Sequence, residues 1–443
     1  MSGYRIDTVL RVRTRHRPGQ LASLATAVAN EGALIGEIVT LRREGDISVR
    51  DITVETNDDD QTERVVAALR LTDGVEVLDV TDRVFDRHKG GKIHSTSRLK
   101  VEQLSDLRYI YTPGVARVAT AIQMEPDRAY ALTGIGNSVG IFTNGTRVLG
   151  LGNIGALASL PVMEGKAVLY DQFVGISAVP ILVDTTDPKA FIETVARVAK
   201  GFGGIHLEDI RIPECFEIEA ELDRILDKPV MHDDQHGTAT VALAGIMNAC
   251  RIVGLDLKSA KMGQVGLGAA GSAIAKLALA YGVGDVAVTD PNEQAVLSCV
   301  AKGARASNFD SIMREADIVV LTTGKPGLVK PEMIRKGQVI FALSNPMPEI
   351  NPNHARQAGA AFAADGQSVN NALAYPGIFK GALEVRSKRI TPEMMIAAAE
   401  AIADHAERGE VVPSPLLPEV HRAVTRAVAD RARAQGLAAT MRL

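Results

Sequence analysis

The sequence predicts an α/β protein of three parts: a small βαββαβ sandwich, an α/β domain in the middle, and a doubly wound domain with a parallel sheet. Three observations support this fold class. The first segment shows strand and helix patterns in the βαββαβ order, a later glycine-rich turn joins a strand to a helix, and the length of 443 residues exceeds one ordinary core. We place the domain boundaries at residues 1–86, 87–232 and 233–443.

Composition and charge are those of a soluble globular protein. Hydrophobic residues make up 46% and charged residues 23% of the sequence, and the formal net charge is -4. Without a basic run there is no reason to expect a nucleic-acid partner, and no apolar stretch is long enough to cross a membrane. The N-terminus lacks the pattern of a signal peptide, so we expect a cytoplasmic location. The 3 cysteines are far apart in the sequence, and we expect buried thiols.

The first domain follows from its periodicity. Every second residue from Ile6 to Val12 is apolar or Thr, which is the period of a half-buried strand. A break around Gly19 then precedes a helix. The remaining elements are strands at residues 34–41 and 49–55, a helix at 62–71 and a strand at 75–80. This order predicts a ferredoxin-like sandwich, and residues 84–100 beyond it are typical of a linker.

The first domain resembles an ACT domain, a small regulatory unit that often binds amino acids between two copies. The resemblance rests on the order of elements and on the loop His-Arg-Pro-Gly-Gln-Leu from His16. In that loop Gly19 would let backbone amide groups approach a ligand carboxylate. The resemblance implies an amino-acid effector, and the alternative is a module that only dimerises the chain.

Three residues of the middle domain have side chains suited to a substrate or a proton. Tyr111 lies just before the Pro113 turn and can donate a proton when a cation tunes it, although a lone Tyr is usually a core residue. The guanidinium fork of Arg147 suits a substrate carboxylate. Lys166 lies in an apolar neighbourhood, where burial would lower its pKa and make it a base. The alternative is a lysine whose head reaches solvent.

Two pairs of adjacent carboxylates follow strand-like runs, Glu208 with Asp209 and Asp233 with Asp234. A hard divalent cation prefers oxygen ligands. Of two consecutive carboxylates, one can coordinate the metal while the other hydrogen-bonds the groups around the ligands. Glu208, Asp209 and Asp234 together give the protein share of a Mg²⁺ or Mn²⁺ site. The alternative for the second pair is a polar loop that caps a helix starting near Thr238.

The last domain carries a dinucleotide signal. A strand-like run at residues 261–265 leads into a glycine-rich turn and a small, apolar helix at 272–281. The next strand ends at Asp290, about 20 residues beyond the turn, where a carboxylate would accept ribose hydroxyls and repel a 2′-phosphate. We therefore predict a Rossmann-type domain that binds NAD. The predicted cofactor-binding residues are Gly266, Leu267, Gly268, Ala269, Ala270, Gly271 and Asp290.

Two later asparagines complete the candidate site. Asn345 follows a strand-like run, and Asn371 lies in a second polar stretch. Either amide could hydrogen-bond a nicotinamide amide or a substrate carboxylate. As isolated residues, both are typical of turns.

From about Ile93 onward the chain resembles the malic enzyme family, in its bacterial, NAD-dependent branch. Four motifs carry the resemblance: Tyr-Thr-Pro-Gly-Val-Ala from Tyr111, Glu-Gly-Lys ending at Lys166, Leu-Glu-Asp around Glu208, and His-Asp-Asp-Gln-His-Gly-Thr-Ala from His232. The resemblance implies that Tyr111 is the general acid, that Lys166 is the general base and that Asp233 supports this base. It implies that Glu208, Asp209 and Asp234 are the metal ligands. The residues that would hold malate and nicotinamide are Arg147, Asn345 and Asn371. It also implies at least a homodimer.

The reaction implied by this resemblance is the oxidative decarboxylation of L-malate to pyruvate and CO₂ with reduction of NAD, using Mg²⁺ or Mn²⁺. Three carboxylates already suit a hard cation, so His232 and His236 are not expected as ligands. The fused ACT-like module implies allosteric control. Two alternatives stay open: a malolactic reaction that converts malate to lactate with bound NADH, and a non-catalytic amino-acid-sensing module.

Overall fold

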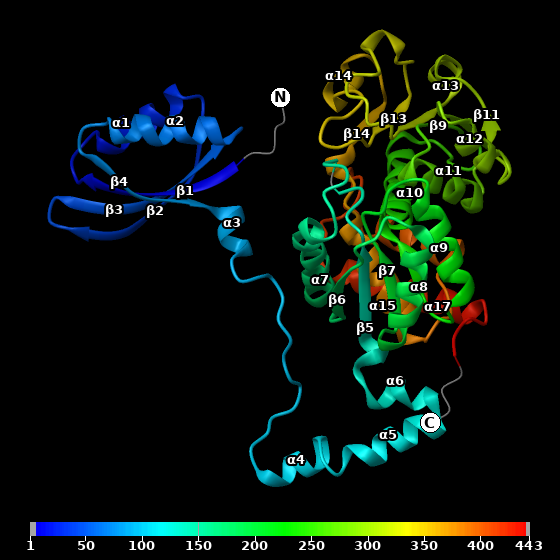
Figure 1. Ribbon diagram of the computed structural model, residues 1–443. Coiled ribbons are helices and arrows are strands. Elements are labelled where there is room, and N and C mark those ends of the chain that lie inside the picture. Colours follow the sequence, from blue (N-terminus) through cyan, green and yellow to red (C-terminus); the bar gives the residue numbers. More distant parts are fainter. Residues whose placement is uncertain (1–5, 149, 440–443) are drawn as a thin grey trace. The chain divides into compact units, whose positions relative to one another are not determined.

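The computed structural model describes residues 6–148 and 150–439. The chain divides into two compact units, Met1–Lys92 and Ile93–Leu443 (Figure 1). Within the described ranges, no helix is both long and apolar enough to cross a bilayer. Cys215, Cys250 and Cys299 are buried and free, which confirms the expectation of buried thiols.

The first unit is a four-stranded antiparallel sheet in the order β2-β3-β1-β4, with its two long helices on one face (Figure 1). Its elements are β1 (Ile6–Arg15), α1 (Gln20–Asn30), β2 (Leu34–Glu44), β3 (Ile47–Thr56), α2 (Asp59–Arg70) and β4 (Val75–Asp82). Leu10, Leu24, Ile52 and Leu69 are fully buried in its core. The predicted βαββαβ order and the ferredoxin-like sheet are confirmed.

The loop ahead of α1 is tied to the turn between α2 and β4. Gly19 has a φ of 83°, in the left-handed region that favours glycine, and no described residue other than its chain neighbours lies within 4 Å of the position where a Cβ would be. Arg17 Nη2 donates to the Asp73 carboxylate at 2.7 Å, and Gln20 Nε2 donates to the Asp73 carbonyl oxygen at 2.7 Å. The loop therefore has a fixed base and an open glycine.

The stretch predicted as a linker begins with a short helix, so that part of the prediction is wrong. Helix α3 covers Arg83–His88. The Asp82 carboxylate caps α3 by accepting hydrogen bonds from the backbone N–H groups of Val84 and Phe85 at 2.7 and 3.0 Å. Beyond α3, residues 89–103 contain neither helix nor strand.

The middle region contains a parallel sheet in the order β6-β5-β7-β8 with helices around it (Figure 1). Its elements are α4 (Leu104–Ile110), α5 (Val115–Met124), α6 (Ala129–Leu132), β5 (Ser138–Thr143), α7 (Leu160–Val174), β6 (Ser177–Leu182), α8 (Pro188–Val198), β7 (Gly204–Leu207), α9 (Glu214–Ile225), β8 (Val230–His232) and α10 (Asp233–Val253). Because these strands run parallel, their carboxyl ends share one edge of the sheet. The segments that follow β7 and β8 therefore lie side by side.

The next region is a six-stranded parallel sheet in the order β11-β10-β9-β12-β13-β14. Its elements are β9 (Lys261–Val265), α11 (Ala269–Tyr281), β10 (Asp285–Thr289), α12 (Glu293–Val300), β11 (Arg305–Ala306), α13 (Phe309–Glu315), β12 (Ile318–Leu321), β13 (Val339–Ala342), α14 (Pro352–Gln357) and β14 (Phe362–Asp365). This is the strand order of a doubly wound dinucleotide-binding domain, as predicted.

The last three helices return from the six-stranded sheet to the middle region. They are α15 (Tyr375–Glu384), α16 (Pro392–Ala403) and α17 (Pro418–Ala434). Helix α16 packs on α10 and on α17, α15 also packs on α17, and both α15 and α17 pack on α7. The buried rings of Tyr375 and Phe379 on α15 contact the ring of Tyr170 on α7. The two α/β regions therefore share one apolar core.

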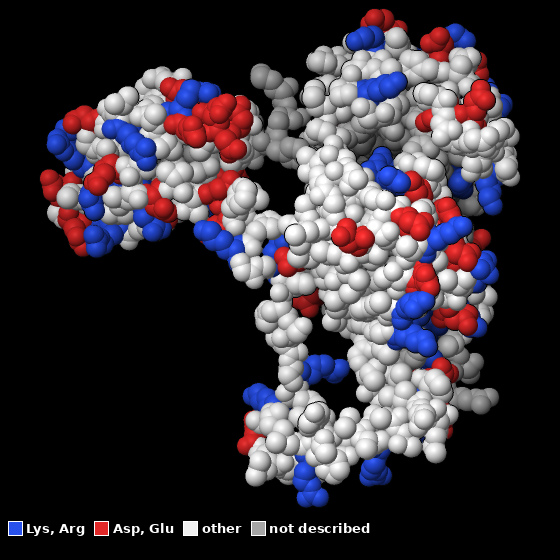
Figure 2. Space-filling model, viewed as in Figure 1, with Lys and Arg blue, Asp and Glu red and all other residues white. Residues whose placement is uncertain are grey.

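Helices α4 and α5 lie apart from that core. Neither helix contains a buried residue. Figure 1 shows both beyond the amino-terminal end of β5, and Figure 2 shows few charged side chains on their surface. Leu104, Tyr109 and Met124 keep 83%, 76% and 78% of their surface exposed. Such a run of exposed apolar side chains is typical of a surface that a partner covers.

Candidate active site

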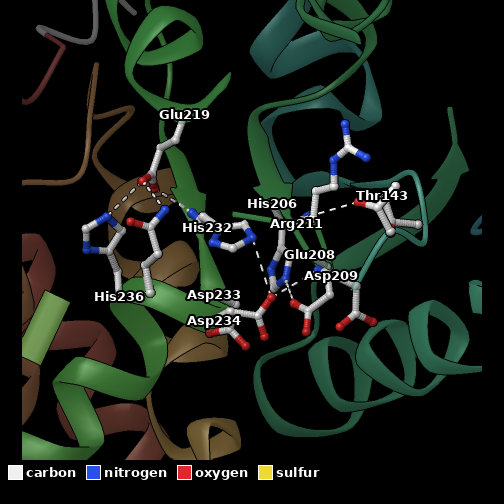
Figure 3. Close-up of polar contacts among 12 residues, drawn as sticks. Thr143, His206, Glu208, Asp209, Arg211, Glu219, His232, Asp233, Asp234 and His236 are labelled. Carbon is white, nitrogen blue, oxygen red and sulfur yellow. Dashed lines mark hydrogen bonds and ion pairs between the residues drawn. The ribbon is translucent and has the colours of Figure 1, made fainter. Parts of the chain in front are cut away.

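The acidic cluster is built at the carboxyl ends of β7 and β8. Leu207 of β7 pairs with His232 of β8 in parallel register, so the residues after each strand start at the same level. The carboxylate pair 208–209 follows β7, and the pair 233–234 opens α10. Figure 3 shows the four carboxylates gathered at this point.

The alternative of a polar loop ahead of a helix near Thr238 is wrong, because α10 begins at Asp233. Asp233 and Asp234 stand in its first turn, where the positive end of the helix dipole favours negative charge. Gly237 makes this packing possible, since a Cβ there would lie 1.7 Å from Asp233 Oδ1. The motif is therefore the start of a helix, and its glycine leaves room for a carboxylate.

Glu208, Asp209 and Asp234 form a group that could hold a divalent cation. Each offers one carboxylate oxygen, and these oxygens lie within 4.8 Å of one another. Asp209 has a φ of 54°, which is uncommon outside glycine, and within residues 6–148 and 150–439 its buried Oδ2 has no hydrogen-bond partner. Burial, reinforced by the charges of Glu208 and Asp234, raises the pKa of Asp209 to about 9. A hard cation would coordinate the unpaired oxygen and reduce the repulsion between the neighbouring carboxylates. This donor set therefore fits Mg²⁺ or Mn²⁺.

Lys166 reaches the acidic cluster from α7. Its Nζ lies 2.5 Å from Asp233 Oδ2, 3.0 Å from Glu208 Oε1 and 4.6 Å from the centre of the Tyr375 ring. The side chain is 12% exposed, so the alternative of a head in solvent is wrong. The expected direction of its pKa is also wrong. Burial lowers the pKa of Lys166, but the charges of Asp233 and Glu208 outweigh burial and raise it well above its ordinary value.

Asp233 is the residue that holds Lys166 in place. It is fully buried, and its Oδ2 accepts a second hydrogen bond from Asn371 Nδ2 at 2.7 Å. Burial raises the pKa of Asp233 to about 6, with the Lys166 charge opposing the rise and the Glu208 charge adding to it. Asn371 therefore lies directly against Asp233, and its predicted contact with malate or nicotinamide stays a prediction.

His206 is a further member of the cluster that the sequence analysis missed. Its Nε2 lies 2.5 Å from Glu208 Oε2, and its Nδ1 lies 2.8 Å from the Tyr170 hydroxyl. Because an ionised Glu208 can only accept, we assign the proton to Nε2 and the donor role at Nδ1 to Tyr170. Burial lowers the pKa of His206 to about 4, which keeps the ring neutral. A signal was present in the sequence, because His206 lies two residues before Glu208, and side chains two residues apart in an extended chain point to the same side.

Glu219 on α9 is a second residue that the sequence analysis missed. Its carboxylate accepts hydrogen bonds from the His232 backbone N–H at 2.7 Å, from Gln235 Nε2 at 2.9 Å and from His236 Nε2 at 3.0 Å. Figure 3 shows it reaching from α9 to the first turn of α10. Nothing in the spacing of the sequence indicates this contact, because it depends on how α9 packs.

The glycine-rich turn after β9 has the close packing of a dinucleotide loop. A Cβ on Gly266 would lie 2.6 Å from the Thr322 carbonyl oxygen, and one on Gly271 would lie 2.0 Å from the Gly266 carbonyl oxygen. Asp290 Oδ2 accepts from the Leu267 N–H at 2.7 Å and fixes the turn. The N-cap residue Gly268 provides no side-chain cap, which leaves N–H groups at the start of α11 for an anion.

The remaining predicted residues lie at the rim of the cluster or away from it. Arg147 is exposed, and its backbone N–H donates to the Asp209 carbonyl oxygen at 3.1 Å. Asn345 is exposed just beyond β13, at the same sheet edge as the glycine-rich turn. Tyr111 is the C-cap residue that follows α4, and it is 70% exposed. Among the described contacts of one chain, none joins Tyr111 to Lys166.

Comparison with known families covers both α/β regions. Residues 91–190 match the malic enzyme N-terminal domain, and residues 303–434 match the malic enzyme NAD binding domain. Residues 233–327 match the NAD binding domain of D-isomer specific 2-hydroxyacid dehydrogenases.

Individual relatives extend the likeness to almost the whole chain. NAD-dependent malic enzyme 1 of Bacillus subtilis is 51% identical over 95% of this chain and 96% of that protein. The NAD-dependent malic enzyme of Geobacillus stearothermophilus is 39% identical over 98% of this chain and 96% of that protein. The crystal structure of malic enzyme from Pyrococcus horikoshii aligns with a TM-score of 0.77 at 38% identity, over 81% of this chain and 92% of that one. The chain therefore belongs to the malic enzyme family.

Proposed function

We propose that this protein oxidatively decarboxylates L-malate to pyruvate and CO₂, with NAD as the oxidant and Mg²⁺ or Mn²⁺ in the acidic cluster. The observation that carries the proposal is the position of Lys166, whose amine lies between Asp233 and Glu208. A base held at the edge of this cluster of carboxylates is suited to remove a proton from an alcohol that the cluster helps to bind. A cytoplasmic location is part of the proposal, in line with free, buried cysteine thiols.

The residues of this chain would share the chemistry as follows. Lys166 takes the proton from the C2 hydroxyl of malate, and Asp233 keeps the amine aimed at that oxygen. Arg147, next to Asp209, binds a substrate carboxylate. When bound, NAD accepts the hydride, and the cation at Glu208, Asp209 and Asp234 neutralises their charge and stabilises the oxygen anion formed in each step. Only the neutral amine of Lys166 can accept this proton, and a cation that neutralises Glu208 would remove one of the interactions that raise the pKa of Lys166, leaving those with Asp233 and Tyr375.

Tyr111 is proposed to donate the proton to C3 after CO₂ has left, and to do so in the site of a second copy. The exposed apolar side chains of α4 and α5 support this, because a homodimer would cover them. The test is complementation between Tyr111→Phe and Lys166→Ala chains, each inactive alone. In a random equal mixture of dimers about a quarter of the wild-type activity should return, since each mixed dimer keeps one intact site. No recovery in proven mixed dimers would contradict a shared site.

A steady-state assay with malate, Mn²⁺ and either NAD or NADP tests the reaction itself. We expect NADH and pyruvate in equal amounts, with NAD preferred because of Asp290. Lactate formed without release of NADH would instead indicate the malolactic reaction. Unchanged activity in Lys166→Ala would refute the mechanism, and no activity in the wild-type chain would favour a sensing module without catalysis.

We also propose that the first unit regulates activity by binding an amino acid at the Gly19 loop. The open, left-handed Gly19 and the fixed base of the loop support a site for a ligand carboxylate. Kinetics of the full chain are compared with those of a chain lacking residues 1–92, over a panel of amino acids. Identical kinetics for both chains under all conditions would refute regulation through this unit.

A further inference from the structure

A cleft of about 610 Å³ lies between α9, α10, α11 and the start of α16. Its apolar wall consists of Phe216, Val230, Met231, Leu277, Ile390 and Met395. The volume falls in the range of sites that hold small organic ligands. The residues that line it include neither the glycine-rich turn nor the acidic cluster, so it is separate from the proposed malate and NAD sites.

Two lysines bring positive charge to this cleft. Lys276 on α11 and Lys302 beyond α12 line the cleft, and neither forms an ion pair within the described part of the chain. The acid Glu219 at the cleft is already bound to His236 at 3.0 Å. Lys276 Nζ lies 5.9 Å from the centroid of the Phe216 ring. The cleft therefore offers two free ammonium groups beside an apolar wall.

One acceptor at the cleft is also unused. Asp223 Oδ1 is buried and has no hydrogen-bond partner among the residues that the structure describes. A ligand that fills the cleft can satisfy it only with an N–H or O–H group. The matching ligand has an apolar body, an anionic group for Lys276 and Lys302, and one hydrogen-bond donor for Asp223.

The cleft is connected to the acidic cluster through shared residues. Glu219 and His236 line the cleft, and Glu219 also accepts from the His232 N–H and from Gln235. These bonds hold the turn of α10 that carries Asp234 (Figure 3). A ligand that competes for Glu219 or moves His236 shifts the first turn of α10.

We propose that this cleft binds a small organic anion with an apolar body and a hydrogen-bond donor, and that its occupancy changes cation affinity at the acidic cluster through Glu219. The coupling is reciprocal, so a cation at the cluster changes the affinity of the cleft ligand by the same factor. The binding part stands on the cleft alone, whereas the coupling part rests on the proposed cation site.

Anilinonaphthalene sulfonate is a suitable probe, because it has an apolar body, a sulfonate and one N–H. Its fluorescence is titrated on the full-length protein with saturating NAD, so that the dinucleotide site is closed to it. We expect one probe per chain. The uncharged analogue phenylnaphthylamine should bind about tenfold more weakly, because it lacks the group that meets the lysines.

Variants separate the cleft from other apolar surfaces. Lys276→Gln with Lys302→Gln should weaken the sulfonate probe about tenfold and leave phenylnaphthylamine unchanged. The matched control, Lys330→Gln with Lys336→Gln, removes two exposed lysines that do not line the cleft. Ala220→Trp should block both probes, because Ala220 lines the cleft and is exposed. If wild type and both double variants bound the sulfonate probe equally well, the proposed anion site in the cleft would be refuted.

The coupling is measured as the affinity for Mn²⁺, from the signal of free Mn²⁺ in electron paramagnetic resonance. Saturating probe should change the Mn²⁺ dissociation constant by about fivefold in wild type and not in Glu219→Gln. An unchanged constant with probe bound would overturn the coupling. Absence of any Mn²⁺ binding would instead overturn the proposed function. In that case the probe titration with NAD present would still show whether the cleft binds an organic anion.

Discussion

Gly237→Ala is expected to disable Lys166, the proposed base, and to leave the proposed cation site intact. The added Cβ would lie 1.7 Å from Asp233 Oδ1, and contacts of real Cβ atoms stay above 3.0 Å, so the carboxylate must move by more than ~1 Å. That movement breaks the 2.5 Å contact with Lys166 and the 2.7 Å hydrogen bond from Asn371. A misplacement of this size costs roughly 100-fold in rate, and we expect a fall in kcat of about 100-fold.

The assay is steady-state kcat with malate, NAD and Mn²⁺, together with a separate measurement of Mn²⁺ affinity, which should not change. Gly245→Ala on the same helix is the matched control, because its Cβ would meet Val411 at 3.0 Å and Phe341 at 3.3 Å, far from the base. It should cost about 1–3 kcal/mol of unfolding free energy and leave kcat unchanged. A kcat of Gly237→Ala close to that of wild type, or an equal loss in Gly245→Ala, would refute the reasoning.

Three further predictions follow from the same contacts. Asp234→Asn should weaken Mn²⁺ binding about 10- to 100-fold, whereas Asp233→Asn should lower kcat and leave Mn²⁺ affinity nearly unchanged; an equal loss of affinity in both would contradict this division. Tyr170→Phe, which removes the donor to His206, should weaken Mn²⁺ binding measurably while the chain stays folded, as checked by its melting temperature. Burial lowers the pKa of His421, so the folded state resists its protonation, and stability should be lost as the pH falls below about 6.5; a His421→Phe variant should show a smaller fall in melting temperature over that range.

Local patterns predicted the elements whose periodicity is unambiguous. The alternation from Ile6 predicted β1, and the turn at Gly266 between a strand and an apolar helix predicted the dinucleotide loop. Close packing explains why the motif requires glycine, since Gly271 has no room for a side chain. Such features are visible in the sequence because neighbouring residues alone determine them.

Other features depend on residues that are distant in the sequence. The start of α10 at Asp233 follows from Glu219, which holds this turn from another helix. The raised pKa of Lys166 comes from two carboxylates on other elements, and no local pattern gives their distance. Tyr111 was predicted as the general acid, but it is 70% exposed, and no local pattern in the sequence gives its distance from Lys166. Each of these features is determined by tertiary contacts and not by local sequence.

During synthesis on the ribosome, Lys166 and Asp233 emerge well before Asn371 and Tyr375, which bind and cover them in the finished fold. Until α15 has been made and has packed on α7, these charged side chains lack the aromatic surface that excludes water from them. The active site is therefore among the last parts of the second unit to form. A chain released before α15 is complete would expose the apolar face of α7 and leave Lys166 without the ring of Tyr375 beside it.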